Sequence, residues 1–317
     1  MNSLNIITKE LINKGWSCDK KYLLTTAGGD KYLLRVTPQE KAANREELFY
    51  LQEKVAELGV PMCKPLKFSK CDEGFYTIQT WIYGKDAEEI IPYVADLDQY
   101  EYGLEAGRIL KVIHSIPAQE NQPDWEVRFN AKMDQKIKMY KECSIEFEGA
   151  ENFIRYIESN RSLLVARPQT FQHGDYHIGN MMIENGKLVI IDFDRYDFGD
   201  PWEEFNRIVW CAQVSPSFAS GIINGYFNHD VPQEFWDLLA LYISSNNGYF
   251  NHDVPQEFWD LLALYISSNM LSSLPWAYPF GQKEVQTMLN QAKDVLHWYD
   301  NMKNTVPRWY YKYKKES

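Results

Sequence analysis

The sequence has no uncharged apolar stretch of about eighteen residues and no apolar core near its start, so it predicts neither a membrane-spanning helix nor a signal peptide. Cysteine is scarce. The five cysteines are scattered and without C-x-x-C spacing, which disfavours disulfides and zinc. An excess of basic residues is also missing, since the net charge of -11 argues against nucleic acid as a partner. We therefore expect a soluble cytoplasmic protein with reduced thiols and no membrane partner. Its oligomeric state stays open.

The chain also lacks a low-complexity linker, although its 317 residues suffice for two lobes with a core each. Hydrophobic residues make up 45% of the sequence and aromatic residues 15%, which is typical of a packed globular protein. We therefore expect two lobes that are joined only by a short hinge.

The most informative motif is HGDYHIGN at residues 173–180, which is followed by the carboxylate of IIDFD at Asp192. Phosphoryl transfer needs a base near the acceptor hydroxyl and oxygen ligands for the metal that bridges the nucleotide phosphates. Asp175 is the candidate base, and Asn180 follows it at the spacing of Asp and Asn in the kinase catalytic loop. One short loop can then present both side chains to the same phosphate. The alternative is a chance match, with His173 and Asp175 as ordinary polar loop residues.

The segment between Asn180 and Asp192, MMIENGKLVI, contains two apolar β-prone runs around Asn185-Gly186. Asn-Gly between such runs is the strongest short signal for a β-hairpin. The predicted hairpin returns Asp192 to the side of Asn180. One amide oxygen and one carboxylate suit Mg2+, which prefers oxygen ligands and keeps several waters.

Four elements in this order, H-G-D-x-x-x-x-N, the hairpin, I-D-F and Gly199-Asp200-Pro201, resemble the C-lobe core of the aminoglycoside phosphotransferase family. The resemblance implies an α+β fold that is two-lobed and protein-kinase-like. Residues 1–84 would form an N-lobe with an antiparallel sheet and one helix. Residues 85–317 would form a mainly helical C-lobe that carries the catalytic-loop hairpin. The implied reaction uses ATP or GTP as phosphoryl donor.

The resemblance also suggests residues for the nucleotide phosphates. Ser17, in KGWSCD, falls where this fold places a phosphate-covering loop, although the match to G-x-G-x-x-G is poor and an ordinary turn is an open alternative. Arg35, in LLRV, stands where protein kinases carry a phosphate-binding lysine. Arginine binds phosphate through two parallel hydrogen bonds but is bulkier than lysine, so the replacement is not neutral. The alternative for Arg35 is an exposed strand arginine.

The segment after Arg35 has apolar residues at helical spacing. Glu47 falls on the inward face of this helix, so we predict that it pairs with Arg35, with Glu46 as the alternative. In the kinase-like fold the hinge then follows, where backbone groups of about Thr80 to Ile82 would hydrogen-bond the nucleotide base.

The acceptor is predicted less sharply than the reaction. An aminoglycoside is the first candidate, because the acidic composition suits a cationic small molecule. Glu203 and Glu204 would then form an acidic floor, or serve only the dipole of a helix that begins near Asp200. Alternatives are a kinase for another small metabolite or a macrolide, and a nucleotide-binding protein without transfer activity. A protein kinase is disfavoured because the stretch from Asp192 to Pro201 is short for an activation segment.

Residues 224–246 recur, residue for residue, as residues 247–269. Each copy carries an apolar stripe at helical spacing, and one position in a fold cannot hold both stripes. The first copy ends in a helix stop, SSNNG, whereas the second continues through MLSSL to Pro275. We predict that the second copy fills the parental helix position and that the first forms an additional helix outside it.

Overall fold

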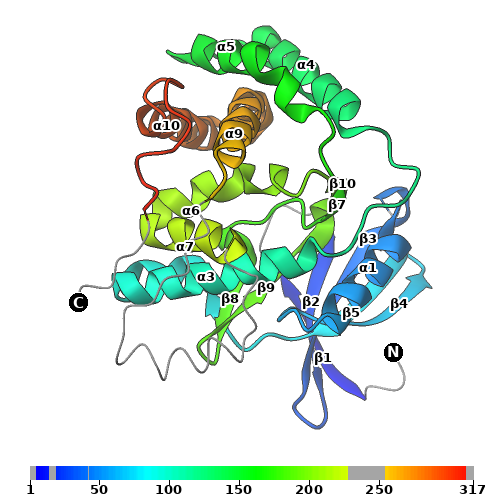
Figure 1. Ribbon diagram of the computed structural model, residues 1–317. Coiled ribbons are helices and arrows are strands. Elements are labelled where there is room, and N and C mark those ends of the chain that lie inside the picture. Colours follow the sequence, from blue (N-terminus) through cyan, green and yellow to red (C-terminus); the bar gives the residue numbers. More distant parts are fainter. Residues whose placement is uncertain (1–4, 14–18, 42, 228–253, 312–317) are drawn as a thin grey trace. The chain divides into compact units, whose positions relative to one another are not determined.

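Figure 1 shows the computed structural model of the chain. The residues that it describes are 5–13, 19–41, 43–227 and 254–311. Within these residues, no helix is both long and apolar enough to cross a membrane.

The chain divides into two compact units. The N-terminal unit comprises Met1–Ile90 and Gly179–Tyr196, and the helical unit comprises Ile91–Ile178 and Asp197–Ser317. The segment with the predicted hairpin therefore groups with the N-terminal strands, whereas the sequence had assigned it to the C-lobe with all residues after 84.

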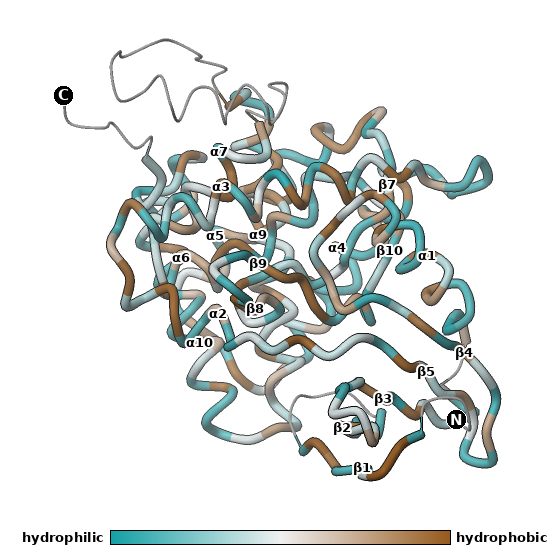
Figure 2. Tube along the Cα trace, turned by 90° about the horizontal axis from the view of Figure 1, so that it is seen from below, coloured by the Kyte–Doolittle hydropathy of each residue, from teal (hydrophilic) through white to brown (hydrophobic). Residues whose placement is uncertain are grey.

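The N-terminal unit is built on a five-stranded antiparallel sheet in the order β1-β2-β3-β5-β4. Its strands are β1 (Ile6–Ile12), β2 (Lys20–Thr26), β3 (Lys31–Pro38), β4 (Pro65–Cys71) and β5 (Gly74–Thr80). Both hydrophobic and hydrophilic residues lie along these strands (Figure 2). Because successive side chains point to opposite faces of a strand, Leu34 and Val36 enter a buried cluster with Ile78, and Arg35 points to the other face. Helix α1 (Arg45–Glu57) follows β3.

A second sheet of the same unit contains β6 (Lys85–Asp86), β8 (Met181–Glu184) and β9 (Lys187–Ile190). Strand β6 leads into the short helix α2 (Ala87–Ile90). Asn185 and Gly186 join β8 to β9 with φ values of 52° and 76°. A two-residue type I′ turn requires positive φ at both positions. The predicted hairpin is therefore present.

In the helical unit, α3 (Asp96–Ile113) and α7 (Pro216–Phe227) lie side by side (Figure 1). A Cβ atom at Gly103 would overlap the carbonyl oxygen of Phe218, and one at Gly225 would overlap that of Leu104. Only glycine permits so close an approach of two backbones. The two helices therefore pack through their main chains.

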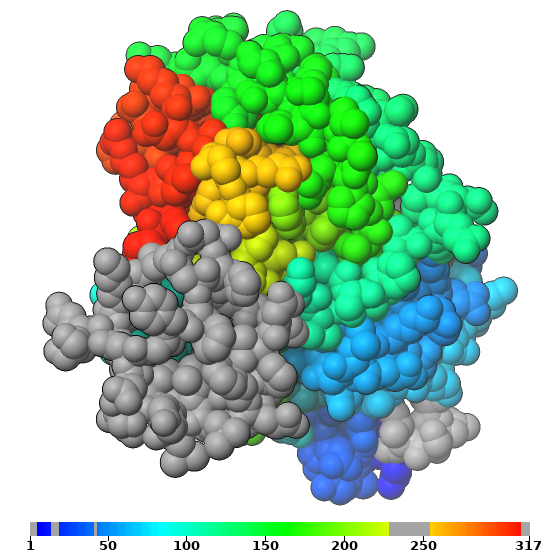
Figure 3. Space-filling view, in the orientation of Figure 1, coloured from blue at the N-terminus to red at the C-terminus, as the bar shows by residue number. Residues whose placement is uncertain are grey.

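Helix α9 (Gln256–Ala277) contacts α4 (Trp125–Glu142), α5 (Ala150–Asn160) and α10 (Gln282–Trp298). On the face shown in Figure 3, the atoms of α10 in red lie against those of α9 in orange. Every residue from 261 to 271 is buried, so α9 is a core helix of this unit.

The second copy of the repeat supplies α9, which continues past Pro275 to Ala277. Met270, Leu271 and Leu274, which follow the repeat, are almost fully buried. The first four residues of the first copy end α7. The additional helix predicted for the first copy lies outside the described residues.

Short elements complete the unit near the HGD motif. Strand β7 (Thr170–Gln172) pairs with β10 (Asp197–Gly199) in antiparallel register. Helix α6 (Ile208–Val214) follows a 3-10 helix, η6 (Glu203–Arg207). These elements position the loop that begins at His173.

Candidate functional site

In the N-terminal unit, charged side chains gather around Arg35, whose side chain is 7% exposed. Its guanidinium contacts Asp19 (Nε to Oδ2, 3.2 Å), Asp192 (Nη1 to Oδ1, 3.3 Å) and Asp194. Arg45, in the first turn of α1, contacts the same Asp194 (2.7 Å) and Asp19 (3.4 Å). We call these five residues the arginine–aspartate cluster, in which two guanidinium groups share three carboxylates.

The cluster balances burial against ion pairing. Burial disfavours the charge of Arg35, but Asp194, Asp192 and Asp19 outweigh it and raise the pKa of Arg35 above its usual range. Burial also raises the pKa of Asp194, although Arg35 acts in the opposite direction. Removing one member of a buried ion pair typically costs about 3–5 kcal/mol, because the partner is left uncompensated. The cluster therefore holds Arg35 beside Asp192.

The hairpin brings Asp192 back to Asn180, as the sequence predicts. The N–H of Ile191 donates to the carbonyl oxygen of Asn180 at 3.0 Å. Asp192 has a φ of 65°, and its side chain is 32% exposed. A left-handed backbone is uncommon for a residue with a Cβ atom and often marks a functional position. Among the described residues, no group of three or more His, Cys, Asp or Glu side chains is arranged to hold a metal. The metal site predicted at Asn180 and Asp192 therefore stays a prediction.

In the helical unit, the buried carboxylate of Glu204 anchors the backbone of the HGD loop. This carboxylate is 2% exposed and accepts hydrogen bonds from the N–H groups of Gly174 (3.0 Å) and Tyr176 (3.3 Å). The N–H of Asp175 donates to Nδ1 of His173 at 3.2 Å. These bonds fix the loop, and the Asp175 side chain remains 20% exposed.

Glu204 does not contribute to an open acidic floor, which was one of its two predicted roles. Burial favours a higher pKa for Glu204, but the imidazole of His114, whose Nε2 lies 3.8 Å from Oε2, together with His173 and the N–H of Gly174, outweighs burial and lowers the pKa. His114 is itself buried, which lowers its own pKa, and its Nδ1 lies 3.0 Å from the hydroxyl of Tyr226. Glu204 is therefore a buried anchor for the loop.

Asp175 has basic neighbours. Its Oδ1 lies 3.2 Å from Nε of Arg207 and 3.7 Å from Nε2 of His177. The side chains of Arg207 and His177 are 24% and 21% exposed, so this side of the loop is accessible to solvent. The ring of His177 faces that of Trp210 with a centroid separation of 6.1 Å. Asp175 is thus an accessible carboxylate beside a cation.

The other predicted nucleotide residues lie at or just after the end of β5, or outside the described residues. Thr80 ends β5, where its N–H donates to the carbonyl oxygen of Lys64 at 2.9 Å. Ile82 is partly buried in the irregular segment before β6. Ser17 is not among the described residues. The hinge and the phosphate-covering loop therefore stay predictions.

Glu47 is not the partner of Arg35, and this prediction is corrected. Glu47 accepts a hydrogen bond from the hydroxyl of Tyr196 at 2.9 Å. Because α1 begins at Arg45, its first turn adds a second arginine to the cluster, and Asp194 pairs with both. The available sequence signal was the extra acid in IIDFD, two residues after the motif carboxylate.

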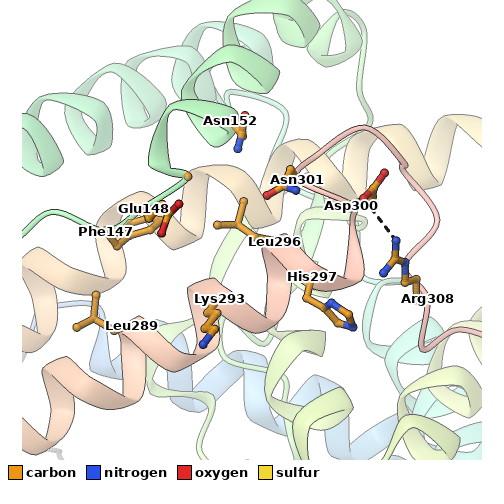
Figure 4. A pocket seen from close by; sticks show the side chains of 11 residues that line it. Phe147, Glu148, Asn152, Leu289, Lys293, Leu296, His297, Asp300, Asn301 and Arg308 are labelled. Carbon is orange, nitrogen blue, oxygen red and sulfur yellow. Dashed lines mark hydrogen bonds and ion pairs between the residues drawn. The ribbon is translucent and has the colours of Figure 1, made fainter.

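A separate pocket of about 690 Å3 lies in the helical unit between the start of α5 and α10. Figure 4 shows Lys293 and His297 on α10, and Arg308 with its ion pair to Asp300 at 3.4 Å. None of the residues predicted for phosphoryl transfer lines this pocket. We therefore assign it no part in the reaction.

The anchored HGD loop, the hairpin with Asp192 and the N-terminal sheet define a kinase-like phosphotransferase. The model of the phosphotransferase enzyme family matches residues 9–235, and the chain belongs to this family. The predicted family is therefore confirmed. No curated protein matches the chain in sequence.

Solved structures of similar fold agree with this assignment. The GDP complex of wild-type aminoglycoside 2′-phosphotransferase-IIIa is 13% identical, with a TM-score of 0.63, and the match covers 93% of this chain and 94% of that one. A choline/ethanolamine kinase family protein from Mesorhizobium loti is 14% identical, with a TM-score of 0.62 and coverage of 94% and 92%. A thermostable mutant of aminoglycoside phosphotransferase APH(4)-Ia is 13% identical, with a TM-score of 0.60 and coverage of 92% and 94%. The predicted α+β kinase-like fold is confirmed.

Proposed function

We propose that this chain transfers the terminal phosphoryl group of ATP or GTP to a hydroxyl group of a small molecule. The observation that supports this best is the hydrogen bond from the N–H of Ile191 to the carbonyl oxygen of Asn180. It joins the residue before Asp192 to Asn180, which itself follows Asp175 by five positions. Such a sequence of base, amide and carboxylate suits phosphoryl transfer, in which the protein mainly positions groups and stabilises charge.

Asp175 would accept the proton of the acceptor hydroxyl as its oxygen attacks the phosphorus atom. The loop needs little reorganisation for this, because Glu204 and His173 already fix its backbone. Proton transfer by a positioned carboxylate typically contributes about 10²- to 10⁴-fold to a rate.

Arg35 would bind the nucleotide phosphates, for which its planar guanidinium is suited. Arg45 shares Asp19 and Asp194 with it, so it can continue to neutralise both carboxylates when Arg35 turns to a phosphate. We keep Ser17, Thr80 and Ile82 as proposed nucleotide contacts, on the basis of the family resemblance.

Asn180 and Asp192 would hold Mg2+, because their oxygen donors fit a hard cation and the cluster leaves the Asp192 side chain partly exposed. When bound, the ion would neutralise the negative charge of the nucleotide phosphates. With Asn180 and Asp192 as the proposed protein donors, the nucleotide and water would complete its coordination.

An aminoglycoside is one acceptor to test, because several proteins of similar fold are aminoglycoside phosphotransferases. A different small metabolite is the second candidate. It is supported by the burial of Glu204 and by Arg207 beside Asp175, since these leave this side of the loop without the acidic floor that a polycation would require.

The experiment measures Mg2+-dependent release of ADP and GDP across a panel of aminoglycosides, macrolides, amino alcohols and hydroxy acids. We compare the wild type with Asp175→Asn and with Asp72→Asn, a matched substitution at an exposed turn of the N-terminal unit. Acceptor-stimulated release should fall about 10²- to 10⁴-fold in Asp175→Asn and stay unchanged in Asp72→Asn.

Two results would count against the proposal. Stimulated release that survives in Asp175→Asn would remove Asp175 as the base. Nucleotide binding without release for any acceptor would favour the nucleotide-binding protein without transfer activity.

A further inference from the structure

Three basic residues lie at four-residue intervals on one face of α4: Arg128, Lys132 and Lys136. Residues four apart in a helix are neighbours on its surface. Arg128 contacts Asp197 at 2.8 Å, and Lys132 contacts the same carboxylate at 3.0 Å. The first two cations therefore share one carboxylate, and the third lies one turn further along the same face.

Lys136 has no carboxylate within ion-pair distance among the described residues, although its side chain is partly buried. Its ammonium lies 5.9 Å from the ring centroid of Phe129, which is a weak contact. Burial, together with the charges of Arg207 and Lys132, lowers the pKa of Lys136 to about 8, although Glu203 acts to raise it. Lys136 is thus an ammonium group that lacks a sufficient counter-ion.

The carboxylates nearby are already committed. Glu203 accepts hydrogen bonds from Gln172 (3.3 Å) and Asn206 (3.2 Å), and burial raises its pKa, which weakens it as a counter-ion. Asp175 faces Arg207 at 3.2 Å. Among these described residues, the four cations of Arg128, Lys132, Lys136 and Arg207 therefore outnumber the three carboxylates of Asp197, Glu203 and Asp175.

We propose that Lys136, together with Arg207, binds an oxyanion of the acceptor, a carboxylate or a phosphate, whose molecule presents a hydroxyl to Asp175. The proposal rests on the proposed function, since it assigns the acceptor class of the same site. Arg207 connects the two parts, because it contacts Asp175 and lies four residues after Glu203 in η6. Glu203 accepts a hydrogen bond from Gln172, the strand partner of Asp197, and Asp197 is the carboxylate that Lys132 contacts one turn before Lys136. An added anion would supply the counter-charge that Lys136 lacks, and charge-assisted hydrogen bonds are among the stronger polar contacts.

The acceptor class follows from this arrangement. A hydroxy acid or a phosphorylated polyol satisfies both requirements, a hydroxyl for transfer and an anion for Lys136. A polycation would bring like charges together beside Lys132 and Lys136, which is unfavourable. The site therefore favours anionic acceptors over aminoglycosides.

The first experiment needs no catalysis. Isothermal titration calorimetry measures the binding of malonate and of inorganic phosphate to the wild type, Lys136→Gln, Lys136→Arg and Lys138→Gln. Lys138 is the matched control, because it lies on the same helix with its side chain 73% exposed and an ion pair to Glu142 at 3.8 Å. The loss of one charge-assisted hydrogen bond weakens binding by roughly 10- to 100-fold.

We expect that weakening in Lys136→Gln, with little change in Lys136→Arg and none in Lys138→Gln. The anion that loses more affinity, malonate or phosphate, identifies the carboxylate or the phosphate as the preferred group. Equal affinity in wild type and Lys136→Gln for both anions would overturn the inference without affecting the proposed transfer reaction.

The second experiment compares acceptors with and without an oxyanion: serine with ethanolamine, and gluconate and glucitol 6-phosphate with glucitol. Nucleotide release should be stimulated more by the acceptors that carry a carboxylate or a phosphate, and Lys136→Gln should raise their KM roughly 10-fold with kcat nearly unchanged. A preference for ethanolamine and glucitol would overturn the inference alone. The absence of Asp175-dependent release with every acceptor would overturn the proposed function and this inference together.

Discussion

Leu262 and Leu239 occupy the same place in two identical copies, so alanine at each position tests which copy the fold uses. Leu262 is fully buried in α9. Truncation of a buried leucine loses transfer free energy and leaves a cavity, which costs about 2–5 kcal/mol. A loss of about 3 kcal/mol in the free energy of unfolding would lower the melting temperature of the helical unit by roughly 6–12 °C. Leu239→Ala should change the free energy of unfolding by less than about 0.5 kcal/mol, because the second copy already fills α9.

The assay is urea denaturation at 25 °C followed by far-UV circular dichroism, with thermal melts of the same samples. Wild type, both single variants and the double variant are compared. A loss in Leu239→Ala as large as that in Leu262→Ala would refute the assignment of α9 to the second copy. Mild effects in both single variants with a severe effect in the double variant would show that the two copies exchange in one position.

Three further predictions concern the repeat, the arginine–aspartate cluster and pH. Deletion of residues 228–250 removes one copy and joins α7 to α9 through the parental sequence, so the melting temperature and nucleotide release should be retained; a failure to fold would contradict this. Arg35→Met should destabilise the N-terminal unit by about 3–5 kcal/mol in chemical denaturation, because buried carboxylates lose their partner, whereas Glu47→Gln should cost less than about 1 kcal/mol. The pKa values of Glu204 and Asp197 are lowered in the fold, since basic neighbours outweigh burial. Their stabilisation is therefore present above the unfolded-state values and is lost as pH falls through about 4 and below. Asp197→Asn should accordingly flatten the fall of the unfolding free energy between about pH 5 and pH 2, and an unchanged pH profile would count against this.

The features that the sequence predicted well depend on short stretches of chain. Asn185-Gly186 between two apolar runs predicts a type I′ hairpin, because few other residues accept positive φ at both positions. The hairpin then determines by register that Asp192 returns beside Asn180. The family and the kinase-like fold were predictable for the same reason, since the motifs combine fixed spacing with local turn chemistry.

The partners of Arg35 could not be predicted, because they come from two segments that are distant from each other in the sequence. Asp19 precedes β2 and Asp194 follows the hairpin, so only the tertiary fold brings them together. The helical spacing correctly predicted that Glu47 lies on the inward face of α1, but it did not predict that its partner is Tyr196. Competition among several buried charges decides such pairing, and no pattern in the sequence measures it.

Lys136 also escaped sequence reasoning. Lysines at four-residue spacing usually form a solvated helix face, and the helical phase that puts Lys136 two turns after Phe129 does not show whether a carboxylate faces it. Its difference from Lys138 lies in burial and in the commitment of neighbouring carboxylates, which are properties of the packed helical unit.

The close packing of α3 on α7 has a practical consequence for protein engineering. Because Gly103 and Gly225 let the two main chains touch, α7 is held by contacts along its own length. The chain carries the 23 residues of an additional copy between the end of α7 and the start of α9, and α9 keeps its buried position. The join between α7 and α9 is therefore a natural place to insert an affinity tag or a fluorescent reporter, or to divide the protein into two complementing fragments.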